Sequence, residues 1–430
     1  MSLGKISHTI KYGSRYLNAI NEDQVFYVLT SIQHKMPEDA ARQPVNLCLV
    51  IDTSTSMKGR PLEVVKHTLT NLHHYLSPDD YVSVVVFNDR ADTLMRPTKI
   101  SEFGNLTRYV MRMHAEGGTE IYQGLKRGYV QIVRSPIFRK STSHLILLTD
   151  GQTYGDSEMC MRLVRSANQE GVIFSAFGLG DEWNDDFLDR LVGYSGGEVT
   201  YLSEVDEFSA LLGAFLSETQ VVDIPQLFMN FETHPAVKIN NLYRMTPGVM
   251  PLLPSNSSYC LGSLVAGKTP IILFEFLIKP FTGVMKLSQL DLLRGTLVPK
   301  NFQKGLQFHA DNLLISVALD LKKQQTNAPD GNVIESVYHI SLYRMQAAAR
   351  KMIRNGDING GISTLQNLAR QLKAQGQESL ATSVIEETEY IQQYQRYSGS
   401  GEKRIKYGTR VLPAVTKPVI RAAPTRKVGL

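Results

Sequence analysis

Apolar runs and amphipathic stretches alternate along residues 44–218. Short apolar runs, at 45–51, 81–87, 144–148 and 172–177, are typical of strands buried on both faces of a sheet. Spacings of three and four between apolar residues predict helices at 61–76, 101–114, 120–134, 156–170, 184–192 and 204–216. Two further strands are expected at 90–95 and 197–202. This alternation indicates an α/β fold with a doubly wound, mostly parallel sheet.

The chain changes character on both sides of this segment. Residues 1–43 hold strand-like pieces such as 24–30 and show no helical period. Residues 219–330 alternate short apolar pieces with Pro, Gly, Asn and Ser, a rhythm typical of a β-sandwich. We expect the N-terminal strands to belong to this sandwich, so that the α/β domain of residues 44–218 is inserted into it.

The C-terminal part is expected to be helical and then basic. Residues 331–397 have helical spacing that resembles a small array of helical hairpins, with too few units to count as repeats. Residues 398–430 carry eight Lys and Arg residues against the single acidic Glu402. We expect a flexible, solubilising tail here. Because it lacks interleaved aromatic residues and any nucleic-acid motif, nucleic-acid binding is not expected.

Composition describes a multidomain folded protein. The 430 residues are 43% hydrophobic and 20% charged, which suits two to four domains with sizeable cores. The three cysteines are widely spaced, which favours a reducing compartment. The first residues lack the apolar core of a signal peptide, and no run approaches the roughly 18 apolar residues of a membrane span. We therefore expect a soluble, cytoplasmic protein without a membrane span.

Oxygen-bearing side chains gather in three loops at the ends of the predicted elements. The strand at 45–51 breaks into Asp52-Thr53-Ser54-Thr55-Ser56. The strand at 144–148 ends in Thr149-Asp150-Gly151, and the loop at 115–119 ends in Thr119. Ligands bind at the carboxyl ends of the strands in such sheets.

The donor atoms of these loops suit a metal ion. Carboxylate and hydroxyl oxygens are ligands of hard divalent cations such as Mg²⁺ and Mn²⁺, with Ca²⁺ as a further candidate. Alternate positions of the first loop would direct Asp52, Ser54 and Ser56 to one point, while Thr53 and Thr55 face away. Asp156 and Asp181 also lie near strand ends, where turn or cap roles are expected.

These residues resemble a known site. The pattern Asp52-x-Ser54-x-Ser56, together with Thr119 and Asp150, resembles the complete metal-ion-dependent adhesion site of the von Willebrand factor type A family, over about residues 44–218. The resemblance implies that Ser54, Ser56 and Thr119 supply hydroxyl ligands, and that Asp52 and Asp150 act directly or through water. The flanking sandwich resembles multidomain relatives such as inter-alpha-trypsin inhibitor heavy chains, although a missing signal peptide argues against a secreted role.

The resemblance implies a non-enzymatic role in protein–protein interaction. Three hydroxyls and few direct carboxylates leave a bound cation under-neutralised, so an Asp or Glu of a protein partner is expected to complete its coordination. In intracellular bacterial relatives the partner is often a MoxR-type AAA ATPase, or a signalling kinase or phosphatase.

Two other functions remain open. A structural or assembly subunit would use the metal only to stabilise the fold. A metal-dependent hydrolase needs a general base or nucleophile beside the ion, and the three loops offer no suitable His or additional carboxylate pair.

Overall fold

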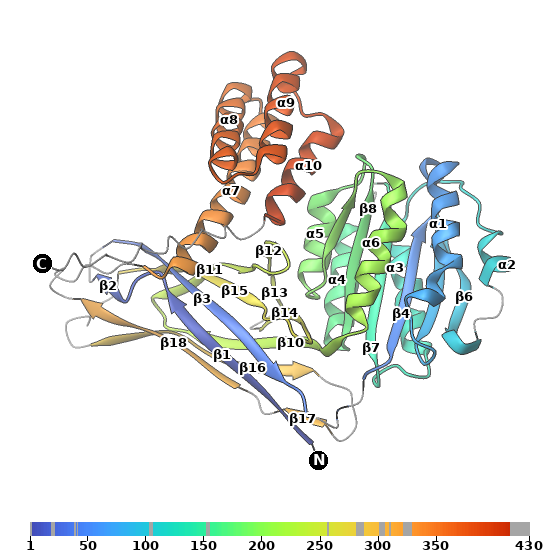
Figure 1. The fold of residues 1–430 in the computed structure, drawn as a ribbon, viewed down its shortest axis with the longest axis horizontal. Helices are drawn as coiled ribbons and strands as arrows, with labels where there is room; N and C mark the ends of the chain where they lie inside the picture. Colours follow the sequence, from blue (N-terminus) through green and yellow to red (C-terminus); the bar gives the residue numbers. More distant parts are fainter. Residues whose placement is uncertain are drawn as a thin grey trace, which may run out of the picture.

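Three structural parts make up the molecule: a β-sandwich, an α/β domain and a helical domain that stands beside both (Figure 1). The structure is a computed structural model and describes residues 2–18, 22–37, 40, 42–102, 106–151, 155–255, 258–280, 288–300, 306–308, 311–320 and 329–412.

The α/β domain is built on one mixed sheet of strand order β6-β5-β4-β7-β8-β9. All neighbours pair in parallel except β6, which runs antiparallel to β5 at the edge. The strands are β4 (Val45–Asp52), β5 (Tyr81–Phe87), β6 (Ala91–Lys99), β7 (Thr142–Thr149), β8 (Val172–Leu179) and β9 (Val199–Leu202). Every position of β4, β7 and β8 is buried, because helices cover both faces of the sheet.

The two faces of β4 serve two separate cores. Leu47, Leu49 and Ile51 pack toward the helices α1, α2 and α6, whereas Cys48 and Val50 pack toward α3, α4 and α5. The helices are α1 (Arg60–Thr70), α2 (Leu106–Val110), α3 (Ile121–Arg134), α4 (Ser157–Gln169), α5 (Asp185–Gly193) and α6 (Phe208–Thr219). The doubly wound α/β fold expected from the sequence is confirmed.

Two expected helices are shorter than the sequence indicates. The helix expected at 61–76 ends at Thr70, where the side chain of Asn71 donates to the carbonyl of His67 at 3.0 Å and a 3₁₀ turn follows. The helix expected at 101–114 ends at Val110, the last residue of α2, and residues 111–114 follow it without helical structure.

The sandwich consists of two six-stranded sheets that share one apolar core. Their orders are β12-β11-β15-β3-β1-β17 and β13-β14-β10-β16-β18-β2. The strands are β1 (Ser2–Tyr12), β2 (Tyr16–Asn18), β3 (Gln24–Lys35), β10 (Val222–Thr233), β11 (Val237–Arg244), β12 (Met250–Pro251), β13 (Pro254–Ser255), β14 (Ser258–Val265), β15 (Ile271–Ile278), β16 (Gln289–Lys300), β17 (Leu306–Phe308) and β18 (Asp311–Asp320). Since β3 pairs with β15 over eight residues, the chain leaves the sandwich after β3 and returns to it at β10.

The helical domain contains α7 (Gly331–Arg354), α8 (Ile358–Ala374), α9 (Glu378–Tyr394) and α10 (Gly399–Arg410). The last helix corrects the expectation of a flexible tail from residue 398. Ser398 caps α10 by accepting a hydrogen bond from the backbone nitrogen of Gly401, and basic side chains of α10 are buried against α5. Residues 413–430, which include Lys417, Arg421, Arg426 and Lys427, lie outside the described residues. Among the helices described, none has the length and hydropathy needed to span a bilayer.

Candidate metal centre

Two of the predicted loops meet because their strands are neighbours. β4 and β7 pair in parallel, so their carboxyl ends lie side by side at one edge of the sheet. Asp52 is the last residue of β4, and Asp150 directly follows the last residue of β7. The sheet topology therefore brings the carboxylates together across almost 100 positions of sequence.

Hydroxyl groups link the two carboxylates. One oxygen of Asp52 accepts a hydrogen bond from the backbone nitrogen of Ser54 at 2.8 Å, and the other accepts from Thr149 Oγ1 at 2.6 Å. Ser54 Oγ lies 3.0 Å from Ser56 Oγ, and Ser56 Oγ donates to Asp150 Oδ1 at 2.8 Å. Ser54 and Ser56 thus link Asp150 to Asp52, through their two hydroxyls and the backbone nitrogen of Ser54.

The second loop lies against the other two. The backbone nitrogen of Glu116 donates to the carbonyl of Thr53 at 2.8 Å, and Thr55 Oγ1 donates to the carbonyl of Gly117 at 3.0 Å. Thr119 is 8% exposed, and a Cβ atom added to Gly151 would lie 2.9 Å from its Oγ1. The structure therefore brings all five sequence-predicted residues into one region, with Thr119 beside the Asp150 loop.

The two intervening threonines make other contacts. Thr53 Oγ1 donates to the carbonyl of Phe87 at 3.0 Å, and Thr55 is occupied with Gly117. Both hydroxyls therefore bond the backbone of neighbouring loops instead of joining the chain of Ser54 and Ser56.

Asp89 is a site residue that the sequence reasoning missed. Its Oδ1 accepts a hydrogen bond from the backbone nitrogen of Gly118 at 3.0 Å. A Cβ atom added to Gly117 or Gly118 would lie 2.5 or 2.6 Å from its carboxylate oxygens, so a side chain at either position would displace the Asp89 carboxylate. The signal in the sequence was its position just after the apolar run at 81–87.

The other acidic residues near strand ends have capping or packing roles. Asp156 precedes α4 and accepts from the backbone nitrogen of Tyr122, in the first turn of α3, at 2.7 Å. Asp181 accepts from Tyr201 Oη at 3.2 Å. Trp183 lies nearby, is 2% exposed and is packed in the core.

Burial disfavours the charged form of the two carboxylates of the site when no cation is bound. Asp52 is fully buried, which raises its pKa to about 6 despite the hydrogen bonds from Thr149 and Ser54. Burial also raises the pKa of Asp150. A cation at this point would favour the charged form of both groups. The donor set of carboxylate and hydroxyl oxygens fits a hard divalent cation.

A second acidic cluster serves a different purpose. Asp185, Asp186 and Asp189 of α5 lie close enough together to share an ion. Instead of an ion, two basic side chains occupy this cluster. Arg350 and Lys406 both form ion pairs with Asp185, and Lys406 Nζ also lies 2.7 Å from a carboxylate oxygen of Asp189. This cluster is a docking surface for the helical domain.

Two family models match the chain. Residues 46–216 match the von Willebrand factor type A domain, and residues 331–414 match the Sll0103-like, C-terminal alpha-helical domain. The uncharacterized protein sll0103 of Synechocystis sp. is 27% identical over 349 residues, which are 79% of this chain and 81% of that protein. Inter alpha-trypsin inhibitor heavy chain 4 of Mus musculus is 27% identical over 198 residues, 44% of this chain, and the match spans 21% of that protein.

Solved structures share the whole architecture. The von Willebrand factor type A protein from Catenulispora acidiphila has a TM-score of 0.76 at 14% identity, covering 96% of this chain and 97% of that chain. The ArnB paralog VWA2 from Sulfolobus acidocaldarius has a TM-score of 0.57 at 15% identity, covering 94% and 98%. At these identities the likeness concerns the fold. Residues 46–216 of this chain thus form a von Willebrand factor type A domain, to which a C-terminal helical domain is joined.

Proposed function

We propose that the protein is a metal-dependent protein-interaction protein. Asp52, Ser54, Ser56, Thr119 and Asp150 would hold one divalent cation, Mg²⁺ or else Mn²⁺ or Ca²⁺. The observation that carries the proposal is the chain of hydrogen bonds from Asp150 through Ser56 and Ser54 toward Asp52, which places the oxygen atoms of two strand ends together.

The chemistry of this donor set favours an acidic partner. Only two of the five side chains carry negative charge, so they leave a bound divalent cation attractive to a further carboxylate. Ser56 is exposed at the surface, which supports access from outside. Lys58 is exposed in the same loop and adds positive charge, whereas Arg60 is paired with Asp206. The partner would therefore present an Asp or Glu residue.

The class of partner and the compartment are parts of the same proposal. By family resemblance, the partner is a MoxR-type AAA ATPase or a signalling kinase or phosphatase. The free cysteines, Cys48, Cys160 and Cys260, are all buried and unpaired, which suits a reducing, cytoplasmic setting. The role is non-enzymatic.

Calorimetric titration with Mn²⁺ and Mg²⁺ tests the metal site. The wild-type protein is expected to bind one ion per chain, and Ser56→Ala is expected to weaken binding about tenfold or more, because a direct oxygen ligand is lost. Ser101→Ala removes another exposed serine hydroxyl far along the sequence and should leave the affinity unchanged. Equal affinity in Ser56→Ala and the wild type would contradict the ligand assignment.

Affinity capture with and without EDTA tests the interaction. A partner identified by mass spectrometry should be lost with EDTA and with Ser56→Ala, and it should be retained by Ser101→Ala. If Asp52→Ala and Ser54→Ala variants fold and retain every partner, the metal only stabilises a structural subunit. Turnover of phosphoester or peptide substrates with Mg²⁺ or Mn²⁺ that disappears in Asp150→Ala would instead establish a hydrolase.

A further inference from the structure

A cavity of about 400 Å³ lies between the α/β domain and the sandwich. It lies at the amino ends of β7 and β8, because Thr142, the first residue of β7, and Ile173, near the start of β8, line it. The candidate metal centre is at the opposite, carboxyl edge of the same sheet. The apolar wall is formed by Ile173, Phe215, Val222, Pro247, Val265 and Pro270. Small-molecule sites often have such volumes and occur preferentially at domain interfaces.

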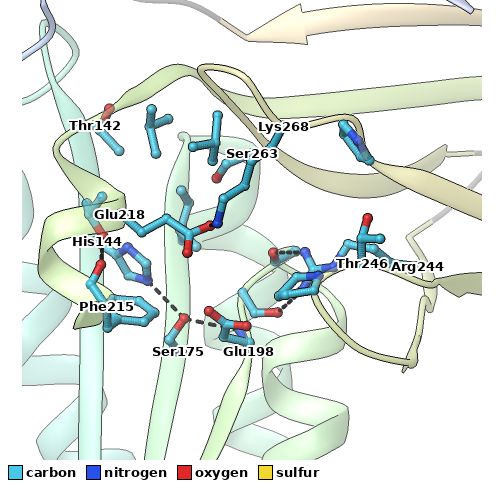
Figure 2. Close-up of a pocket in the computed structure, with 18 of the residues that line it drawn as sticks. Thr142, His144, Ser175, Glu198, Phe215, Glu218, Arg244, Thr246, Ser263 and Lys268 are labelled. Atoms are coloured by element: carbon cyan, nitrogen blue, oxygen red, sulfur yellow. Dashed lines mark hydrogen bonds and ion pairs between the residues drawn. The ribbon is translucent and has the colours of Figure 1, made fainter. Parts of the chain in front are cut away.

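Polar groups of the α/β domain form one side of the cavity. His144 Nε2 lies 2.9 Å from Ser175 Oγ, and this hydroxyl also accepts a hydrogen bond from the backbone nitrogen of Glu198 at 3.2 Å (Figure 2). Burial lowers the pKa of His144 to about 3, so the ring is neutral. Ser175 is 1% exposed, and its hydroxyl already contacts both His144 and the backbone nitrogen of Glu198. The pair is therefore a scaffold and not a nucleophile with its base.

The carboxylate of Glu198 is the group left without a donor. It lines the cavity, is partly buried, and accepts no hydrogen bond from any residue that the structure describes. Burial raises its pKa, and the nearby charge of Arg244 opposes this effect. Its oxygens are not among the fully buried polar atoms, so a ligand in the cavity can reach them and donate a hydrogen bond to them.

The positive and negative charges of the side chains around the cavity already offset one another. Arg244 donates its two terminal nitrogens to the carbonyls of Gly196 and Gly197 at 2.6 and 3.0 Å, which fixes its charge near Glu198. Lys268 of the sandwich reaches across to Glu218 of α6, 2.7 Å away (Figure 2). Because each acid has a basic neighbour, a charged ligand would add an uncompensated charge at this interface.

We propose that this cavity binds a small uncharged molecule with a largely apolar body and a head group that donates a hydrogen bond to Glu198. An alcohol or a primary amide has this chemistry. A molecule bound there would contact the α/β domain and the sandwich together, and it would stabilise their arrangement by mass action.

Ligand-observed NMR titration of the full chain with one series of compounds tests this proposal. The series keeps a phenylpropyl body and varies the head: alcohol, primary amide, methyl ether, ammonium and carboxylate. The alcohol and the amide are expected to bind saturably. The ether, which accepts but cannot donate, should bind at least about tenfold more weakly, as should both charged compounds. Glu198→Leu should abolish the difference between alcohol and ether.

Two tryptophan variants control for non-specific binding. Thr269→Trp, at the exposed rim of the cavity, should abolish binding of the alcohol. Ala266→Trp lies in the same exposed turn but does not line the cavity, and it should bind as the wild type does. No saturable binding by the wild type, equal binding by the two variants, or a preference for a charged or non-donating head would overturn the proposal.

Discussion

Side-chain hydroxyls connect the buried acid of the candidate metal centre to its surroundings. Asp52 has no exposed surface, and its second oxygen depends on Thr149 Oγ1 at 2.6 Å. The charge of a buried carboxylate is tolerated only where donors reach it. Thr149 is the last residue of β7 and its side chain is fully buried, so its role is local and structural.

Thr149→Val tests this dependence. The substitution keeps the shape of the side chain but leaves one oxygen of Asp52 without its donor, so it should lower the free energy of unfolding by about 1–3 kcal/mol. Urea denaturation measures the change. Thr142→Val, at the other end of the same strand, removes a hydroxyl with no hydrogen bond among the described residues, and it should change stability much less. Equal losses would mean that β7 simply disfavours valine.

Some residues of the two candidate sites could be predicted from the sequence, and others could not. Asp52, Ser54 and Ser56 follow an apolar run directly, so their place at the edge of the sheet needs only local reasoning. Asp89 and Glu198 were missed because their importance depends on what other segments bring near them. A carboxylate on a loop has no sequence signal that separates a positioning contact from a solvated charge.

At the scale of elements, the docking of α10 is a second feature that the sequence does not reveal. Its basic residues resembled a solvated tail, yet Lys403, Lys406 and Arg410 are at most 5% exposed. Lys403 lies over the ring of Trp183, with its nitrogen 4.8 Å from the ring centroid. The alternation of strands and helices in the α/β domain was predictable because each run carries its own period. The docking of α10 was not, because its partners lie on α5, more than 200 residues earlier.

Arg350→Met tests the ion-pair cluster at this interface. Arg350 on α7 donates to both oxygens of Asp185 at 2.6 Å, and both side chains are less than 10% exposed. Removing Arg350 takes two charge-assisted hydrogen bonds from the buried Asp185 and leaves Lys406 as its remaining cation, so stability should fall by about 1.5–3 kcal/mol. Lys351→Met also replaces a basic residue by methionine, but at the neighbouring, exposed position. Urea denaturation should show a large loss of stability for Arg350→Met and almost none for Lys351→Met.

The same cluster predicts a loss of stability in acid. Although burial alone would raise the pKa of Asp185, its hydrogen bonds and charge interactions with Arg350 and Lys406 hold it below its ordinary value. A lowered pKa in the folded state stabilises the protein above the unfolded value, near pH 4, and this contribution is lost as the pH falls. The free energy of unfolding should therefore decrease below about pH 4–5, and less steeply in Asp185→Asn. Parallel pH profiles for the two proteins would contradict this assignment.

At the scale of the whole molecule, Arg410 joins all three parts. Its guanidinium donates to Asp189 of the α/β domain at 2.8 Å and to Tyr343 Oη of α7 at 3.2 Å. Its carbonyl accepts a hydrogen bond from the backbone nitrogen of Val249, in the sandwich, at 2.9 Å. Composition and apolar periodicity carry no information about these contacts, because each of them joins residues that are far apart in the sequence.

Truncation separates the role of α10 from that of the residues after it. A chain ending at residue 398 lacks α10 and would expose the packed faces of Trp183 and Tyr201. Calorimetry should then show the helical domain and the α/β domain unfolding in separate transitions, with the α/β domain melting at a lower temperature because the ion pairs to α5 are absent. A chain ending at residue 412 keeps α10 and should melt as the full chain does. If both truncated chains melt like the full protein, α10 is not what couples the helical domain to the α/β domain.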